Sequence, residues 1–154
     1  MSQIEAKLAS LGVTLPAPAA PGGAYLPYRI HGDTLILAGV ISSFNGQMTH
    51  VGQVGKEQTI ETARESAKIC ALNVLTNIKQ ALGSLDRVTA FLYVGGYVNG
   101  VSGFADAPLV INGASEFFVE VFGDVGRHAR AAVTVAGLPK NSTTEIQVTV
   151  AFKP

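Results

Sequence analysis

An arginine and a glutamate near the carboxyl end of the chain are the side chains best suited to chemistry on a small acid. Arg130 lies in a predicted strand over residues 129–136, and Glu145 lies in a second predicted strand over residues 143–152. A guanidinium can bind a carboxylate through two parallel N–H donors. A carboxylate can orient a water molecule or relay a proton. The two residue types therefore indicate an anion site and an acid–base group in the same region.

Alternation along the two strands predicts that both charges lie on the sheet face turned away from the core. The apolar residues expected to meet the helices are Ala131, Val133 and Val135 in the first strand and Ile146, Val148, Val150 and Phe152 in the second. In a plain hairpin around Lys140, Arg130 pairs near residue 150, several residues from Glu145. A ligand, a water molecule or a neighbouring subunit can then bridge the two charges. A buried Arg–Glu pair with a purely structural role remains the alternative.

The remaining elements are predicted from apolar periodicity and from capping residues. The predicted helices span residues 1–11, 59–82 and 113–122, and the other strands span residues 28–31, 34–41 and 87–98. Asn112 is expected to cap the last helix. The order β-β-α-β-α-β-β predicts an α+β fold with one mixed sheet and two helices packed on one side. Residues 1–23 are expected to form a short helix and a connector rich in Pro, Ala and Gly, followed by one domain over residues 24–154.

The charge balance argues against binding to nucleic acid or to an acidic membrane. Lys plus Arg number 11 and Asp plus Glu number 11, so no basic surplus is present for phosphate contacts. Charged residues make up only 14% of the chain and hydrophobic residues 47%. So few charges predict that part of the surface is covered by other copies of the same chain.

The sequence shows no pattern typical of a metal site or of a serine nucleophile. The three histidines, His31, His50 and His128, show no metal-ligand spacing, and no serine lies in a nucleophile elbow. We therefore expect neither a metal nor a cofactor. The single cysteine, Cys70, lies in an apolar helical stripe and is expected to be buried. With no visible secretory leader, a cytoplasmic location is expected.

Three segments in the second half of the chain form a distinctive pattern. Residues 110–116 read VINGASE, residues 122–130 read FGDVGRHAR, and Leu138-Pro139 is followed by Glu145. In order, spacing and residue type this pattern resembles the RidA/YjgF family, also called the L-PSP endoribonuclease family. The resemblance runs from about residue 25 to residue 152. It is strongest to the YjgF endoribonuclease-like branch, which has an extended signature in its second half.

The resemblance implies a chorismate-mutase-like fold and a homotrimer with clefts between adjacent subunits. It also implies hydrolysis of 2-aminoacrylate and related imines without a cofactor. By position, Arg130 resembles the residue that clamps the substrate carboxylate, and Glu145 resembles the acid that positions the attacking water. Tyr25 resembles a tyrosine at the cleft mouth, Gly39 a position where the backbone touches ligand, and Asn112 a ligand-proximal asparagine.

Ala132 departs from the family pattern, because many members have a cysteine at this substrate-binding position. Thiol chemistry is therefore absent from the implied site, although the backbone carbonyl of Ala132 remains. Ala38 and Val40 replace a more polar pair around Gly39. The pocket is thus expected to be more apolar and to suit a larger side chain.

Three functions are consistent with these residues. The first is a hydrolytic deaminase of small enamine and imine acids, in which Arg130 and Glu145 are catalytic. The second is a protein that binds a small acid, such as a 2-keto acid, without turning it over. The third is the endoribonuclease that the family label suggests, which the zero net charge disfavours.

Overall fold

Six strands form one mixed sheet in the computed structural model, which describes residues 2–154. They are β1 (Tyr28–His31), β2 (Thr34–Leu37), β3 (Val40–Ile41), β6 (Val88–Asn99), β7 (Ala129–Val135) and β8 (Thr144–Phe152). The order is β1-β2-β8-β6-β7, with β3 also beside β8. Only β6 and β7 run parallel. Two further strands, β4 (Ser43–Phe44) and β5 (Gln47–Met48), pair as a small separate hairpin.

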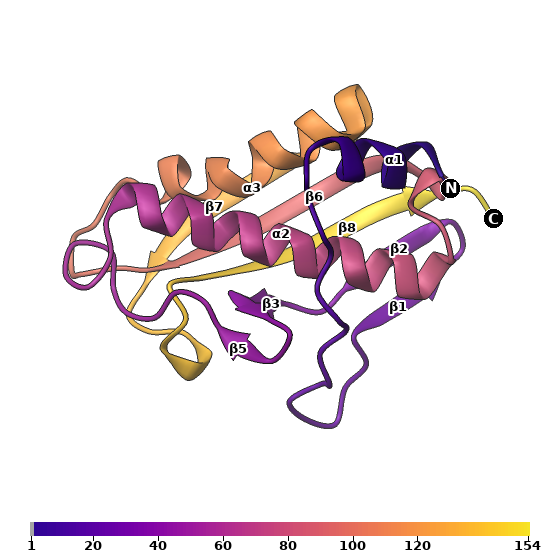
Figure 1. Cartoon of the computed structure of the whole chain (residues 1–154). Helices are drawn as coiled ribbons and strands as arrows, with labels where there is room; N and C mark the ends of the chain where they lie inside the picture. Colours follow the sequence, from indigo (N-terminus) through magenta and orange to yellow (C-terminus); the bar gives the residue numbers. More distant parts are fainter. Residues whose placement is uncertain (1) are drawn as a thin grey trace.

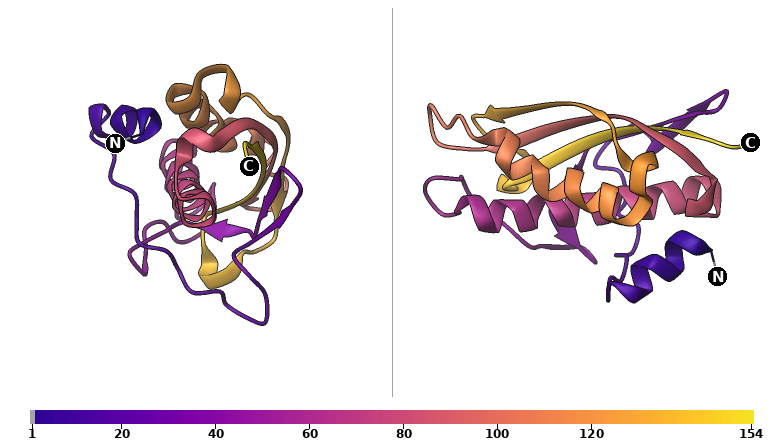
Figure 2. Two further views of the ribbon diagram at one scale, coloured as in Figure 1. Left: turned by 90° about the vertical axis from the view of Figure 1, so that its right-hand side faces the viewer. Right: turned by 90° about the horizontal axis from the view of Figure 1, so that it is seen from above.

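Two long helices, α2 (Ile60–Leu82) and α3 (Ala107–Phe122), cover one face of this sheet (Figures 1 and 2). The α+β architecture with two helices on one side is therefore confirmed, with the short helix α1 (Gln3–Ser10) added. Met1, which the first predicted helix included, lies outside the described residues. Among residues 2–154, no helix combines the length and apolarity needed to span a bilayer.

Helix α2 begins and ends where the sequence predicts. The hydroxyl of Thr59 accepts a hydrogen bond from the Thr62 N–H, and Thr62 reciprocates to the Thr59 N–H, which completes a capping box. At the other end Gly83 adopts a left-handed conformation with φ of 79°, which costs glycine little. One face of the helix, including Cys70, Val74 and Ile78, is fully buried.

Helix α3 is longer than predicted, so Asn112 is not its cap. The helix begins at Ala107 with a proline in its first turn, and Asn112 lies inside it. A proline at that position needs no N–H donor and is pre-set for a helix. The two helices pack so closely that a β-carbon on Gly113 would lie 2.2 Å from the Arg64 carbonyl oxygen. Because Asn112 lies inside the helix and does not cap it, its side chain is free for a tertiary contact.

Strands β7 and β8 do not form the predicted hairpin. Strand β6 lies between them, parallel to β7 and antiparallel to β8. The connection through the 3-10 turn Pro139–Asn141 therefore crosses the end of β6 rather than joining two neighbours. Pairing of this kind depends on contacts distant in sequence, which local turn residues do not specify.

The predicted orientation of β8 is confirmed and that of β7 is wrong. Ile146, Val148 and Val150 are fully buried against the helices, as predicted. On β7, however, Arg130 is in register with the buried Val94 of β6, so it faces the helices. The set Ala131, Val133 and Val135 lies on the opposite face, where Val133 is 48% exposed. The more apolar side of this strand thus points away from the core.

The N-terminal segment packs against the domain. Asp86 accepts hydrogen bonds of 2.8 Å from the N–H groups of Gln3 and Ile4 at the start of α1. The carbonyl oxygen of Pro16 accepts a 2.9 Å hydrogen bond from the Thr76 hydroxyl on α2. These contacts hold α1 against the 3-10 turn Leu85–Arg87 and the connector against α2, which it crosses (Figure 1). The division between residues 1–23 and 24–154 stays a prediction.

Candidate functional site

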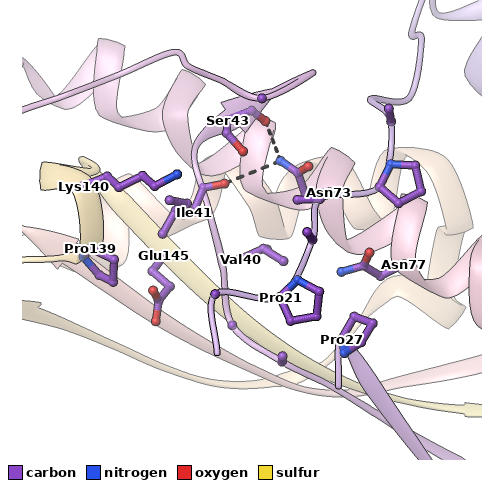
Figure 3. A pocket seen from close by; sticks show the side chains of 18 of the residues that line it. Pro21, Pro27, Val40, Ile41, Ser43, Asn73, Asn77, Pro139, Lys140 and Glu145 are labelled. Atoms are coloured by element: carbon purple, nitrogen blue, oxygen red, sulfur yellow. Dashed lines mark hydrogen bonds between the residues drawn. The ribbon is translucent and has the colours of Figure 1, made fainter. Parts of the chain in front are cut away.

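The predicted site residues fall into two groups in the structure. Tyr25, Gly39 and Glu145 line one pocket of about 680 Å³, a size within the range of small-molecule sites. Arg130, Asn112 and Ala132 do not line it and lie instead between β7 and α3. Figure 3 shows the pocket with Glu145 and Lys140 at one end and two asparagines at the other.

Glu145 extends from β8 toward the bend between β2 and β3. One carboxylate oxygen lies 3.0 Å from the place where a β-carbon on Gly39 would stand. Any larger residue at this position would push the Glu145 carboxylate by a few tenths of an ångström. Among residues 2–154, no hydrogen bond or ion pair engages the Glu145 carboxylate.

Burial raises the pKa of Glu145 above its ordinary value of 4.5, because desolvation penalises the charged form. A carboxyl group with a raised pKa exchanges a proton closer to neutral pH than an ordinary glutamate. Glu145 therefore has the position and the chemistry of a general acid–base group facing a ligand-sized space.

Lys140 is a pocket residue that the sequence analysis treated only as part of a turn. It has a φ of 53° in the 3-10 turn before β8, and its side chain lines the pocket near Glu145 (Figure 3). It brings a positive charge to the same end of the cavity. The turn residues in the sequence predict a turn at Lys140, but they do not show which distant segments surround it. The sequence alone could therefore not identify Lys140 as a pocket residue.

The connector before β1 builds one wall of the pocket. Ala17 donates a 2.8 Å backbone hydrogen bond to the Asn45 side chain, which fixes this stretch beside the β4–β5 hairpin. Tyr25 is 54% exposed, and its hydroxyl accepts a 3.1 Å hydrogen bond from the Gly22 N–H. The tyrosine thus lies at the open side of the pocket, consistent with its predicted place at a cleft mouth.

Arg130 is the centre of the second group. Its Nη1 donates to the Asn112 Oδ1 at 2.7 Å and to the Ser115 Oγ at 3.2 Å, both on α3. The guanidinium is half-buried, and no carboxylate pairs with it among the described residues. Ala132, two residues further along β7, packs partly buried against the core on the same face. Both hydrogen bonds use Nη1, so the Nε and Nη2 N–H groups of Arg130 have no acceptor among the described residues and can bind an external anion.

A hydrogen-bond chain fixes the orientation of this arginine. The carbonyl of Gly126 can only accept, so the His128 Nδ1 donates to it at 2.7 Å. The His128 Nε2, 2.9 Å from Ser115, then accepts from the serine hydroxyl. Burial lowers the pKa of His128, helped by the nearby Arg130 charge, which favours this neutral form. The Ser115 Oγ can then accept the hydrogen bond from the Arg130 Nη1.

Arg130 and Glu145 lie on opposite faces of the sheet. Arg130 is in register with Val94 of β6, which faces the helices. Glu145 is in register with Tyr97 of β6, whose side chain alternates to the other face. The prediction that both charges share the outer face is therefore wrong for Arg130. A single chain does not bring the two groups into one site.

The remaining candidate groups have ordinary roles. Cys70 is buried as predicted, and burial raises the pKa of its thiol to about 12, which leaves it unreactive. His50 lies 3.5 Å from Glu65 near the surface. Over residues 2–154, no three His, Cys, Asp or Glu side chains gather as metal ligands would.

Comparisons with known proteins agree with this fold. The sequence model of the family described as "YjgF/chorismate_mutase-like, putative endoribonuclease" matches residues 5–151. Protein TCP17 of Trypanosoma cruzi is 39% identical over 151 residues, covering 96% of this chain and 93% of that protein. Both matches extend into the N-terminal segment.

Solved structures give the same result. The protein Atu1372 of Agrobacterium tumefaciens, described as of unknown function, is 38% identical with a TM-score of 0.91, over 97% of this chain and 92% of that one. RidA of the Antarctic bacterium Psychrobacter sp. PAMC 21119 is 28% identical with a TM-score of 0.59, over 88% and 94%. The chain belongs to the YjgF/chorismate mutase-like family, and the resemblance stated from its motifs is confirmed.

Proposed function

We propose that this chain is a hydrolytic deaminase of small enamine and imine carboxylic acids, and that two protomers of a homotrimer complete each site. Arg130 of one protomer binds the substrate carboxylate, and Glu145 of a neighbour faces the reacting carbon. Support comes from the separation of these groups within one chain, together with the likeness to a protein named RidA.

Glu145 and Arg130 have separate roles in this reaction. The enamine takes a proton on its β-carbon and becomes an imine, water adds to C2, and the C–N bond breaks to release ammonia and a 2-keto acid. The Glu145 carboxyl, with its raised pKa, can donate a proton in one step and accept one from water in another. Arg130 holds the carboxylate in place, and no step requires a cofactor.

The sheet face that carries Glu145 offers a surface for a second copy. Ile36 is 49%, Tyr93 39% and Val133 48% exposed on this face. Large apolar side chains gathered on one open face favour burial against another protomer. A closed ring of identical contacts would then supply an Arg130 to each Glu145.

The test combines two inactive variants in one trimer. Arg130→Ala and Glu145→Gln, each expressed alone, should lose nearly all release of ammonia from 2-aminoacrylate. When the two are co-expressed with different tags and purified through both, each mixed trimer keeps one intact site of three. Activity should therefore return to about one third of the parent value, as ring symmetry dictates.

Two results would count against the proposal. Unchanged turnover by Arg130→Ala would exclude the deaminase mechanism. Two inactive variants that stay inactive in a verified mixed trimer would exclude a shared site.

Binding of a small acid without turnover is the second candidate. It is favoured by Arg130 itself, which Asn112 and Ser115 hold in place without a carboxylate partner among the described residues, because this arrangement binds an anion whether or not a reaction follows. Calorimetry with pyruvate, run beside the ammonia assay, separates the two functions, because binding without ammonia release supports this one. An RNA-cleavage assay on the same preparation addresses the endoribonuclease named in the family description.

A further inference from the structure

The pocket contains polar side chains that the proposed reaction does not use. Asn73 and Asn77 lie one turn apart on α2 and line the end of the pocket away from Glu145 and Lys140 (Figure 3). Asn77 is only 8% exposed. Within residues 2–154, its side-chain amide makes no hydrogen bond. Its donor and acceptor atoms are therefore available to a ligand in the pocket that Asn77 lines.

Asn73 adds a second open acceptor beside it. Its Nδ2 donates to the Ser43 carbonyl at 2.7 Å and to the Ile69 carbonyl at 3.1 Å. Carbonyl oxygens can only accept, so these bonds fix the orientation of the amide. Its Oδ1 is left without a donor among the described residues, and Asn73 lines the pocket.

Prolines make up part of the pocket wall near these amides. Pro18, Pro21 and Pro27 line the pocket, and Figure 3 shows Pro21 and Pro27 beside Asn77. Prolines have no backbone N–H to donate. The amide atoms of Asn77 and the Asn73 Oδ1 are not sealed in the core, since the buried side-chain atoms without a partner in residues 2–154 are the Asn99 Oδ1 and the Thr134 Oγ1. Pocket-lining amide atoms that no protein group engages fit a site where a ligand supplies the hydrogen bonds.

We propose that Asn77 and the Asn73 Oδ1 form a subsite for a neutral group with both donors and an acceptor, a carboxamide, at the far end of the substrate. This inference rests on the proposed function, since the acid end of the same ligand binds beside Glu145. The carboxamide N–H groups donate to the two asparagine oxygens, and its carbonyl accepts from the Asn77 Nδ2. The cation lining the pocket, Lys140, is at the opposite end, so a second carboxylate is disfavoured at this end.

Three acids of equal length test this selectivity by calorimetry on the full chain. Glutaramate ends in a carboxamide, 5-methylhexanoate in an isopropyl group of the same shape, and glutarate in a carboxylate. Glutaramate should bind roughly tenfold or more tightly than either of the others, the factor that one to two net hydrogen bonds supply. Equal or reversed affinities would overturn the proposal.

Asn77→Leu is the informative variant, because leucine has a similar volume and no polar atoms. It should abolish the preference for glutaramate over 5-methylhexanoate and leave the melting temperature unchanged or raised. Asn99→Leu is the matched control. Asn99 is also buried, at 1% exposed against 8% for Asn77, but its Nδ2 donates to Asn141 at 2.9 Å and to Ser142 at 3.2 Å, while its Oδ1 has no partner in the described part of the chain. That variant should lower the melting temperature.

The outcomes separate this inference from the proposed function. If Asn77→Leu keeps the glutaramate preference, or unfolds as readily as Asn99→Leu, the asparagine has a structural role and the subsite is wrong. If glutaramate selectivity depends on Asn77 but no ammonia is released from 2-aminoacrylate, the subsite stands and the deaminase function fails.

Discussion

Glu145 and Gly39 are in such close contact that a single methyl group would disturb the pair. A β-carbon on Gly39 would lie 3.0 Å from the carboxylate oxygen and 3.3 Å from the carboxyl carbon. Gly39 ends the stretch between β2 and β3, where the strand predicted over residues 34–41 is interrupted. The bend thus gives the glutamate room to face the pocket, and the position of the acid depends on a residue that has no side chain.

Gly39→Ala should therefore lower activity more than stability. The added methyl group must push the carboxylate by a few tenths of an ångström, and misplacement on this scale costs about tenfold in kcat/KM. The free energy of unfolding should fall by no more than about 1 kcal/mol, since the carboxylate can move toward the pocket. Deaminase kinetics and thermal melting measure the two effects.

The control for that variant is Gly137→Ala, because a β-carbon there meets nothing within 4 Å. It should change neither quantity. Parent-like kcat/KM in Gly39→Ala would show that the position of Glu145 does not limit the reaction.

Asn112→Asp should block the anion site while preserving the fold. The asparagine oxygen already accepts from Arg130 at 2.7 Å, so a carboxylate in its place would pair with the guanidinium. A paired arginine attracts a substrate carboxylate less, and the Kd for pyruvate should rise at least about tenfold. The melting temperature should hold or increase. Ser115→Ala removes the longer contact to Arg130, of 3.2 Å, together with the 2.9 Å hydrogen bond between Ser115 and His128, and leaves the Asn112 contact in place. It should have a smaller effect on binding, and the reverse order would contradict this role for Arg130.

The raised pKa of Glu145 predicts a pH dependence of stability. Because burial favours the protonated form in the folded chain, the native state binds more protons here than the unfolded state. This contribution is complete below the ordinary pKa of 4.5 and is lost as pH rises from there through the folded pKa. Glutamine cannot ionise, so the melting temperature of Glu145→Gln minus that of the parent should increase over this interval. A difference that stays constant or decreases with pH would mean that the carboxyl group is not desolvated.

Helix α2 and strand β8 show what could be predicted from sequence. The Thr59 cap, the Gly83 end and the apolar stripe between them act within a few residues of one another, and the observed helix follows them closely. The alternation of β8 is equally local. The motif around Arg130 and Glu145 also identified the family correctly.

Strand β7 shows why the rest could not be predicted. Its two sides differ little in polarity except for Arg130, and the more apolar side was assigned to the core. The structure turns it outward, because pairing with β6 sets Arg130 in register with the buried Val94 and α3 supplies hydrogen-bond acceptors for the guanidinium. None of these partners is close to Arg130 in sequence.

The sequence by itself therefore determined the family, the helices with strong caps and the residue types of the anion and acid groups, because these depend on local chemistry and motif spacing. Only the tertiary structure decided that Arg130 and Glu145 lie on opposite faces, and that Lys140, Asn73 and Asn77 join Glu145 around one pocket. The physical reason is that sheet order, register and pocket walls arise from contacts between segments distant in sequence. Their stability depends on packing that cannot be predicted from a local sequence pattern.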